Sequence, residues 1–278
     1  MICIFVRKEN MLRYIDTHVH LYDEAFDPDR EVVIERIKAA GVWKCLLPAI
    51  DSTYYERQTQ FADCNVGFAY EAMGLHPTSV STNWKEELLF VRDKLYGGER
   101  RYYAVGEIGL DCYWSKEFIE LQKEVFLKQL LYAYDLSLPV IIHVREATAE
   151  IFDVLDKFKT EAGLHAGETR LKGVFHAYSG SIETFERLSS YGDFRVGIGG
   201  VVTYKNAGVA KALENIDMEH ILLETDSPWL TPVPFRGKRN ESSYLSYIAQ
   251  KVASIKNSSP EEVANITTEN AQKLFNIS

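Results

Sequence analysis

The sequence lacks any apolar run close to the roughly 20 residues that a membrane-spanning helix requires. It also lacks the pattern of a secretory signal, because its opening apolar patch of about five residues stands before its basic residues instead of after them. We therefore expect a cytoplasmic protein without a membrane partner. Residues 1–10 are either an upstream extension or a misassigned start, since Met11 follows them, and residues 11–278 are expected to form a single domain.

Cysteine is scarce, and a basic surface is missing. The four cysteines, at positions 3, 45, 64 and 112, show none of the short paired spacings of zinc sites or disulfide frameworks, so we expect them to be reduced. The formal net charge of −9 argues against a broad basic surface for duplex nucleic acid. A small anion site remains compatible with this charge, because bound cations and a few basic side chains can reverse the potential locally.

Short apolar segments bounded by turn residues alternate with helical patterns along the chain. Eight β-like segments are expected at residues 12–17, 43–50, 68–75, 102–109, 138–144, 171–177, 194–200 and 220–226. Helices are expected between them, at residues 28–40, 53–62, 84–95, 117–136, 146–157, 181–190 and 209–216. Such alternation is typical of parallel strands joined by helices, and with this chain length it predicts a (β/α)8 TIM barrel.

Two additional C-terminal helices are expected at residues 242–256 and 260–274, packed outside the barrel. Ser259 followed by Pro260 is a favourable start for the second of them. An open doubly wound sheet is the structural alternative, but such a sheet normally carries a Gly-rich phosphate turn after its first strand. The segment DTHVH, which begins at Asp16, occupies that place here.

Polar side chains gather at the predicted C-terminal ends of the strands, where enzymes with this fold carry their active sites. In strand order they are Asp16, His18, His20, His76, Glu107, His143, Arg145, His176, Tyr178, Tyr204, Lys205, Glu224 and Asp226. Five of the seven histidines belong to this set. The other two, His165 in a polar loop and His220 at the start of the eighth strand, are interpreted as ordinary structural or surface residues.

His18 and His20 are separated by one residue, so an extended strand would point both imidazoles to the same side, as a metal ion requires. Taken alone, the pair could simply face solvent, but His143 and His176 at two other strand ends reduce the weight of that reading. Glu107 lies in the apolar segment AVGEIGLD, where an unpaired carboxylate would be costly to bury. The flanking strands offer it no Lys or Arg, so a cation is the expected partner.

The sequence therefore predicts a centre for two divalent metal ions that share Glu107. One ion is expected to bind His18, His20, Glu107 and Asp226, and the other Glu107, His143 and His176. Because all these ligand atoms are nitrogen or oxygen, Zn²⁺, Mn²⁺ and Mg²⁺ all remain possible. Glu107 and Asp226 are also the expected catalytic residues, with Asp226 assigned to the attacking water.

A series of motifs runs through the chain in order: IDTHVHL, GLHP, GEIGLD, LPVIIHVREA, FHAYSG, GIGGVVTYK, LLETDSPWLTP, RGKRN and NAQKLF. Together they resemble the TatD-related hydrolases, which are metal-dependent deoxyribonucleases of the amidohydrolase superfamily. The resemblance extends from about Ile15 to Phe275 and covers nearly the whole chain. It is therefore far more specific than any one of the motifs.

The resemblance implies a TIM barrel, divalent metals and cleavage of DNA, often as a 3′-to-5′ exonuclease on single strands, with a role in DNA repair. By position it supports all six metal ligands named above. It places six further residues on the substrate side: His76, Arg145, Tyr178, Lys205, Arg236 and Asn240. Tyr178 stands where many relatives have Phe, and Glu241-Ser242 where many have Glu-Pro, which puts loop shape and substrate contacts in doubt.

Basic residues near the predicted ligands independently suit a phosphate. Arg145 lies two positions after His143, and the run RGKR begins at Arg236, although a solvated loop is the plainer reading of that run. Tyr113 and Trp114 either stack on a base or simply pack. Two other functions remain open: an amidohydrolase reaction on a small ester, amide or lactone, and a metal-dependent nucleic-acid-binding module without turnover. No motif indicates an obligate protein partner.

Overall fold

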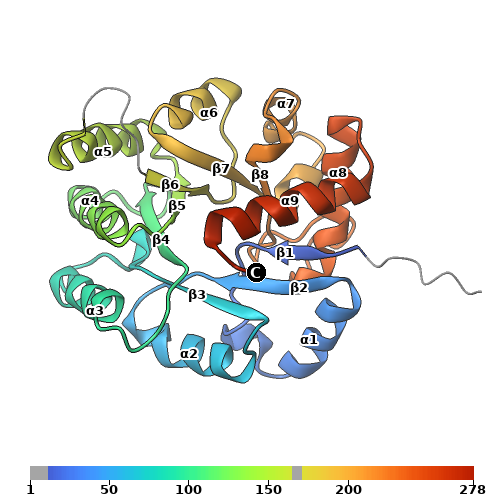
Figure 1. Ribbon diagram of the computed structural model, residues 1–278, viewed down its shortest axis with the longest axis horizontal. Helices are drawn as coiled ribbons and strands as arrows, with labels where there is room; N and C mark the ends of the chain where they lie inside the picture. Colours follow the sequence, from blue (N-terminus) through green and yellow to red (C-terminus); the bar gives the residue numbers. More distant parts are fainter. Residues whose placement is uncertain (1–11, 165–170) are drawn as a thin grey trace, which may run out of the picture.

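The computed structural model describes residues 12–164 and 171–278. The proposed N-terminal extension, residues 1–10, lies outside the described residues, as does His165. Eight parallel strands form a nearly closed barrel in the order β1 to β8, with helices between them (Figure 1). The expected (β/α)8 barrel is therefore confirmed.

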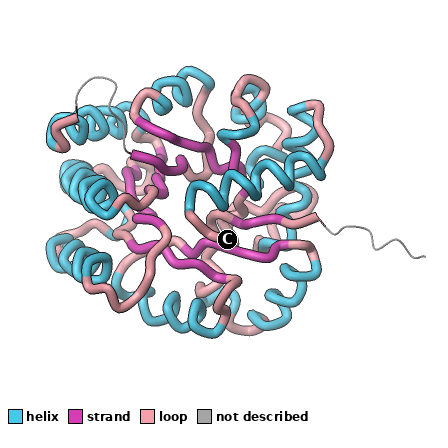
Figure 2. The backbone as a smooth tube through the Cα atoms, viewed as in Figure 1, coloured by secondary structure: helices cyan, strands magenta, loops and turns pink. Residues whose placement is uncertain are grey.

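The strands form the inner ring of the molecule and the helices surround them (Figure 2). The strands are β1 (Tyr14–Asp16), β2 (Val42–Leu47), β3 (Ala69–Met73), β4 (Ala104–Asp111), β5 (Val140–Arg145), β6 (Leu171–Phe175), β7 (Gly192–Ile198) and β8 (Ile221–Leu223). The helices are α1 (Arg30–Ala39), α2 (Tyr55–Cys64), α3 (Trp84–Tyr96), α4 (Ile119–Leu136), α5 (Thr148–Glu161), α6 (Ile182–Ser189), α7 (Val209–Leu213), α8 (Leu245–Lys256) and α9 (Pro260–Phe275). Within the described ranges, no helix combines the length and apolar character needed to cross a membrane.

Local sequence signals set the ends of several helices. The Ser181 side chain accepts a hydrogen bond from the backbone N–H of Thr184 and so begins α6. The Ser259 side chain does the same with Glu262, and Pro260 occupies the first turn of α9, as the sequence predicts. The cap at Ser181 therefore fixes how much loop remains between β6 and α6, and the cap at Ser259 fixes the turn between α8 and α9.

The barrel closes between β1 and β8, its two shortest strands, which have three residues each. The backbone N–H of Thr17 donates to the carbonyl of Leu223 at 3.1 Å, and the N–H of Asp226 donates to the carbonyl of His18 at 2.9 Å. The N–H of His20 donates to the carbonyl of Ser227, also at 2.9 Å. The closing bonds therefore lie mostly beyond the strands, among the residues predicted to bind metal.

Helix α9 packs outside the barrel, as expected. It crosses the N-terminal end of the barrel, and the C-terminus lies at the centre of that end (Figure 1). Leu274 and Phe275 pack in one buried cluster with inward-facing residues of the strands, such as Ile15, Leu46 and Ile141. The sequence predicts this helix and its packing outside the barrel, but not which surface of the barrel it covers. The opposite end of the barrel remains available for a functional site.

Candidate metal centre

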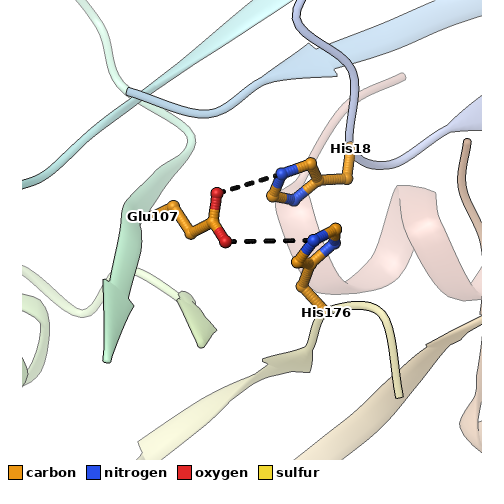
Figure 3. Close-up of side chains that lie close together, drawn as sticks. All are labelled: His18, Glu107 and His176. Carbon is orange, nitrogen blue, oxygen red and sulfur yellow. Dashed lines mark ion pairs between the residues drawn. The ribbon is translucent and has the colours of Figure 1, made fainter. Parts of the chain in front are cut away.

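The predicted metal ligands converge at the C-terminal end of the barrel, although they come from five different strand segments. His18 and His20 follow β1, Glu107 lies in β4 and His143 in β5. His176 directly follows β6, and Asp226 comes three residues after β8. Figure 3 shows Glu107 with one carboxylate oxygen turned towards His18 and the other towards His176. Residues up to 208 positions apart, from His18 to Asp226, therefore meet at the strand ends, as the sequence predicts.

Glu107 occupies the centre of this cluster. One oxygen lies 3.1 Å from Nε2 of His18, and the other lies 2.9 Å from Nδ1 of His143 and 3.8 Å from Nε2 of His176. Burial alone would raise the pKa of Glu107, but the neighbouring histidines hold this pKa well below its usual range. Glu107 is therefore a buried anion with imidazoles on several sides.

The donor atoms form three overlapping groups of the size that a metal ion needs. Within each group the donor atoms lie within 4.8 Å of one another. The first group is His18, His20 and Asp226, the second is His18, Glu107 and His176, and the third is His76, Glu107 and His143. Nε2 of His18 faces Nε2 of His20 at 3.3 Å. Burial lowers the pKa of both rings, which favours the neutral imidazole that binds metals. The donor set fits divalent cations.

Three of the histidines have one ring nitrogen held by an outer partner and the other turned inward. Nδ1 of His20 lies 2.8 Å from the Tyr22 hydroxyl, which donates its own proton to the carbonyl of Pro48. The Tyr22 oxygen can then only accept from His20, so the proton of His20 sits on Nδ1 and Nε2 is left free for a metal. Such outer partners orient the ring before a metal binds.

Two carboxylates, Glu224 and Asp111, are the outer partners that orient His176 and His143. Neither carboxylate has a role in the sequence-based prediction. Oε1 of Glu224 lies 2.9 Å from Nδ1 of His176, and Oδ2 of Asp111 lies 2.9 Å from Nε2 of His143. Glu224 has no exposed surface and also accepts the N–H of Ala177 at 2.6 Å. Both residues stand at strand ends near a ligand, which is the one signal that could have indicated their role.

Protonation of His176 is coupled to these carboxylates. Burial lowers the pKa of His176, but Glu224, Glu107 and Asp226 outweigh it and raise this pKa to about 10. A cation that binds Nε2 must therefore displace a proton.

Asp226 follows β8 and lies among the histidines that follow β1 and β6. Its carboxylate oxygens are 3.8 Å from Nε2 of His18, 3.7 Å from Nε2 of His20 and 3.8 Å from Nε2 of His176. Burial, with repulsion from Glu107 and from a second carboxylate, raises the pKa of Asp226 to about 7 despite the attraction of His176. Its backbone is left-handed, with φ of 55°, and its N–H is held by the His18 carbonyl.

His76 is closer to the metal ligands than the sequence analysis expected. Its Nε2 lies 3.5 Å from Oε1 of Glu107, and its ring centroid lies 4.6 Å from that of His143. Nδ1 contacts the hydroxyl of Thr78 at 2.6 Å. His76 therefore belongs to the donor set by position, in addition to its predicted place on the substrate side.

The remaining predicted substrate residues divide into two kinds. The Arg145 guanidinium lies over the Tyr113 ring at 3.6 Å, the Arg236 guanidinium lies over the Tyr204 ring at 4.3 Å, and Lys205 is exposed. Tyr178 and Asn240 are buried instead. The Tyr178 hydroxyl donates to the carbonyl of Ser181, and the Asn240 amide donates to the carbonyls of Thr225 and Trp229. Their polar groups are therefore engaged with the loops around the centre, and their contact with a substrate stays a prediction.

Comparison with known proteins agrees with this geometry. The model of the family described as TatD related DNase matches residues 15–276. This chain belongs to that family. The TatD-related chain is 38% identical over 263 residues to the Bacillus subtilis protein named uncharacterized metal-dependent hydrolase YabD, covering 94% of this chain and 98% of that one. It is 31% identical to uncharacterized metal-dependent hydrolase YcfH of Escherichia coli, over 95% of this chain and 96% of that one.

A solved structure supports the same assignment. The TatD homologue YjjV of Escherichia coli superposes with a TM-score of 0.86 at 28% identity, covering 96% of this chain and all of that chain. The TatD-related chain is accordingly a metal-dependent hydrolase with a TIM-barrel fold.

Proposed function

We propose that this hydrolase cleaves phosphodiester bonds of DNA, as a 3′-to-5′ exodeoxyribonuclease that acts on single strands or ends. The observation that carries the proposal is the set of donor groups sharing Glu107, beside the exposed basic residues Arg145, Lys205 and Arg236. A phosphodiester carries one negative charge and needs both charge neutralisation and an activated water. The family name supports DNA as the substrate class, and a role in DNA repair is part of the proposal.

The centre is proposed to hold two divalent ions, Mg²⁺, Mn²⁺ or Zn²⁺, on His18, His20, Glu107, His143, His176 and Asp226. When bound, such ions lower the pKa of an attacking water and neutralise charge on the phosphate in the transition state. Glu107 supplies oxygens to two of the donor groups, and His76 offers a further nitrogen to the group that contains His143.

Asp226 is the proposed general base. Burial raises the pKa of Asp226, so its carboxylate accepts a proton more readily than an exposed aspartate does. Its carboxylate lies among the imidazoles of His18, His20 and His176. From there it can orient the attacking water and take its proton.

Arg145, Lys205 and Arg236 are the proposed phosphate contacts. The guanidinium groups of Arg145 and Arg236 each lie over a tyrosine ring, and both residues are exposed. A guanidinium can donate two parallel N–H bonds to phosphate oxygens. Asn240 contributes by holding the loop on which Asp226 stands, and Tyr178 by holding the loop that follows His176.

The experiment is incubation of single-stranded DNA, labelled separately at the 5′ and the 3′ end, with Mg²⁺ or Mn²⁺. Stepwise loss from the 3′ end supports the proposal, whereas internal cuts contradict the exonuclease mode. A panel of small esters, amides and lactones is assayed in parallel. Turnover of one of these, with DNA left intact, would instead indicate another amidohydrolase reaction, and DNA binding without any turnover would indicate a binding module.

A further inference from the structure

Two large aromatic side chains are exposed on the loop after β4, beside the metal centre. Trp114 is 71% exposed and Tyr113 is 49% exposed, which makes Trp114 the more exposed of the two. Burying such apolar surface is favourable, so an exposed indole next to an active site indicates a binding surface. The plainer reading, simple packing, does not apply to Trp114, because most of its surface faces solvent.

The two rings have different surroundings. Tyr113 is covered on one face by the Arg145 guanidinium at 3.6 Å, and it meets Trp114 edge-on, with centroids 5.0 Å apart and planes at 83°. The guanidinium is farther from the Trp114 ring, at 5.3 Å. Tyr113 therefore supports both neighbours, while the Trp114 ring is the one left open for a flat ligand.

This aromatic pair is tied directly to the metal centre through Asp111. Oδ1 of Asp111 accepts the backbone N–H of Tyr113 at 2.9 Å and that of Trp114 at 3.2 Å. Oδ2 of the same carboxylate lies 2.9 Å from Nε2 of His143. Arg145 is placed by the same strands, because the Cys112 N–H donates to the Arg145 carbonyl. The Asp111 carboxylate thus links the backbone that carries the indole to a metal ligand, and the backbone bond from Cys112 holds Arg145 beside them.

We infer that Trp114 is a stacking site for one unpaired nucleobase of single-stranded DNA, with the adjacent phosphate on Arg145. The inference rests on the proposed function. Stacking on Trp114 would select unpaired bases, because a base inside a duplex has both faces covered. Every base has a π-face, so the site tolerates any sequence. It also supplies affinity that does not depend on salt, which suits a protein with a net charge of −9.

The test combines substitution of Trp114 with removal of single bases from the substrate. Trp114→Ala should raise the KM for a short single-stranded oligonucleotide by about 5- to 150-fold, with a much smaller change in kcat. Trp114→Phe should restore most of the affinity. An oligonucleotide series with one abasic residue at each position in turn should show one position where base loss raises the wild-type KM. At that position, base loss should not raise the KM of Trp114→Ala any further.

Matched measurements separate this role from a structural one. Tyr96→Ala removes a similarly exposed aromatic, 46% exposed on α3, and should leave kcat and KM unchanged. Metal content should stay at the wild-type value in both Trp114 variants, because a loss there would mean that the substitution acts through Asp111 and His143.

Two negative results have different meanings. If wild-type protein cleaves the oligonucleotide and Trp114→Ala has the same KM and the same abasic profile, the stacking site is overturned and the proposed function stands. If wild-type protein leaves every oligonucleotide intact, the proposed function fails and this inference fails with it.

Discussion

Glu107 contributes oxygens to two donor groups, so a change at this one residue tests whether the two groups act together. Glu107→Gln keeps the shape of the side chain but removes its charge, and Gln is a poor bridging ligand. We expect metal content to fall at both positions in parallel, with hydrolytic activity lost to the same extent. Metal analysis after gel filtration, beside activity at saturating Mn²⁺, measures both.

Glu71 provides the matched control for that experiment. It is also a buried glutamate on a strand, but it pairs with Arg100 at 2.6 Å and contacts none of the predicted ligands. Glu71→Gln should retain full metal content. Retention of both metals by Glu107→Gln would exclude the shared role.

Asp226 is expected to act on the water as well as on a metal. Asp226→Asn removes the proton acceptor but leaves a side chain of the same size, so kcat should fall by about a hundred- to ten-thousand-fold. Binding of DNA should change far less, because the proposed phosphate contacts Arg145, Lys205 and Arg236 are untouched. Steady-state kinetics with metal-replete protein gives the two quantities separately. Near-normal turnover in that sample would reduce Asp226 to a metal ligand.

The sequence predicts the metal ligands better than it predicts the side chains that hold those ligands in place. His18, His20 and Glu107 could be predicted because spacing and burial cost constrain them locally. The roles of Glu224 and Asp111 could not, because each depends on which strand end lies beside which, and that follows only from the register of the barrel. The burial of Asn240 likewise depends on the path of the loop that follows β8.

Strand β7 contributes to the centre without providing a ligand, because it leaves room for Glu224. A Cβ at Gly197 would lie 2.0 Å from Oε2 of Glu224. Gly197→Ala should therefore displace Glu224 from His176 and lower metal affinity by about 10- to 100-fold, as loss of an outer partner does. Glu224→Gln should act in the same direction without the steric conflict. Metal titration by calorimetry measures the affinity.

A second glycine serves as the control for that substitution. Gly208 has no atom within 4 Å of the place where a Cβ would stand, so Gly208→Ala should bind metal as the wild type does. Unchanged affinity in both Gly197→Ala and Glu224→Gln would show that His176 is oriented by other contacts.

At the scale of elements, the expected helices and strands agree well with those of the structure because their periodicities are strong. The surface that α9 covers is the exception. The sequence predicts a helix packed outside the barrel, but it does not indicate whether that helix covers the N-terminal end or the outer ring. The contact between Asn270 and the carbonyl of Ile221 anchors α9 at the N-terminal end, and only the structure provides that pairing.

The whole molecule depends on a short seam between β1 and β8, and this seam passes through the metal centre. His18 and His20 stand on one side of it and Asp226 on the other, joined by backbone bonds at 2.9 Å. Metal binding should hold the two sides together and offset repulsion between the buried carboxylates. Chelation should therefore lower Tm, and for ligand at about 100 times its Kd the stabilisation lost is about 2.7 kcal/mol.

Hydrogen exchange locates the effect within the barrel. The amides of His20 and Asp226 should exchange faster after chelation, whereas amides in the β6–β7 pairing, such as Gly173 and Phe194, should change little. Asp226→Asn should show a smaller response to chelator than the wild type, because one side of the seam has then lost a charged ligand. A uniform change across all strands would mean that the ions stabilise the fold as a whole. An unchanged Tm in protein shown to have lost its metal would mean that the backbone bonds of the seam suffice without it.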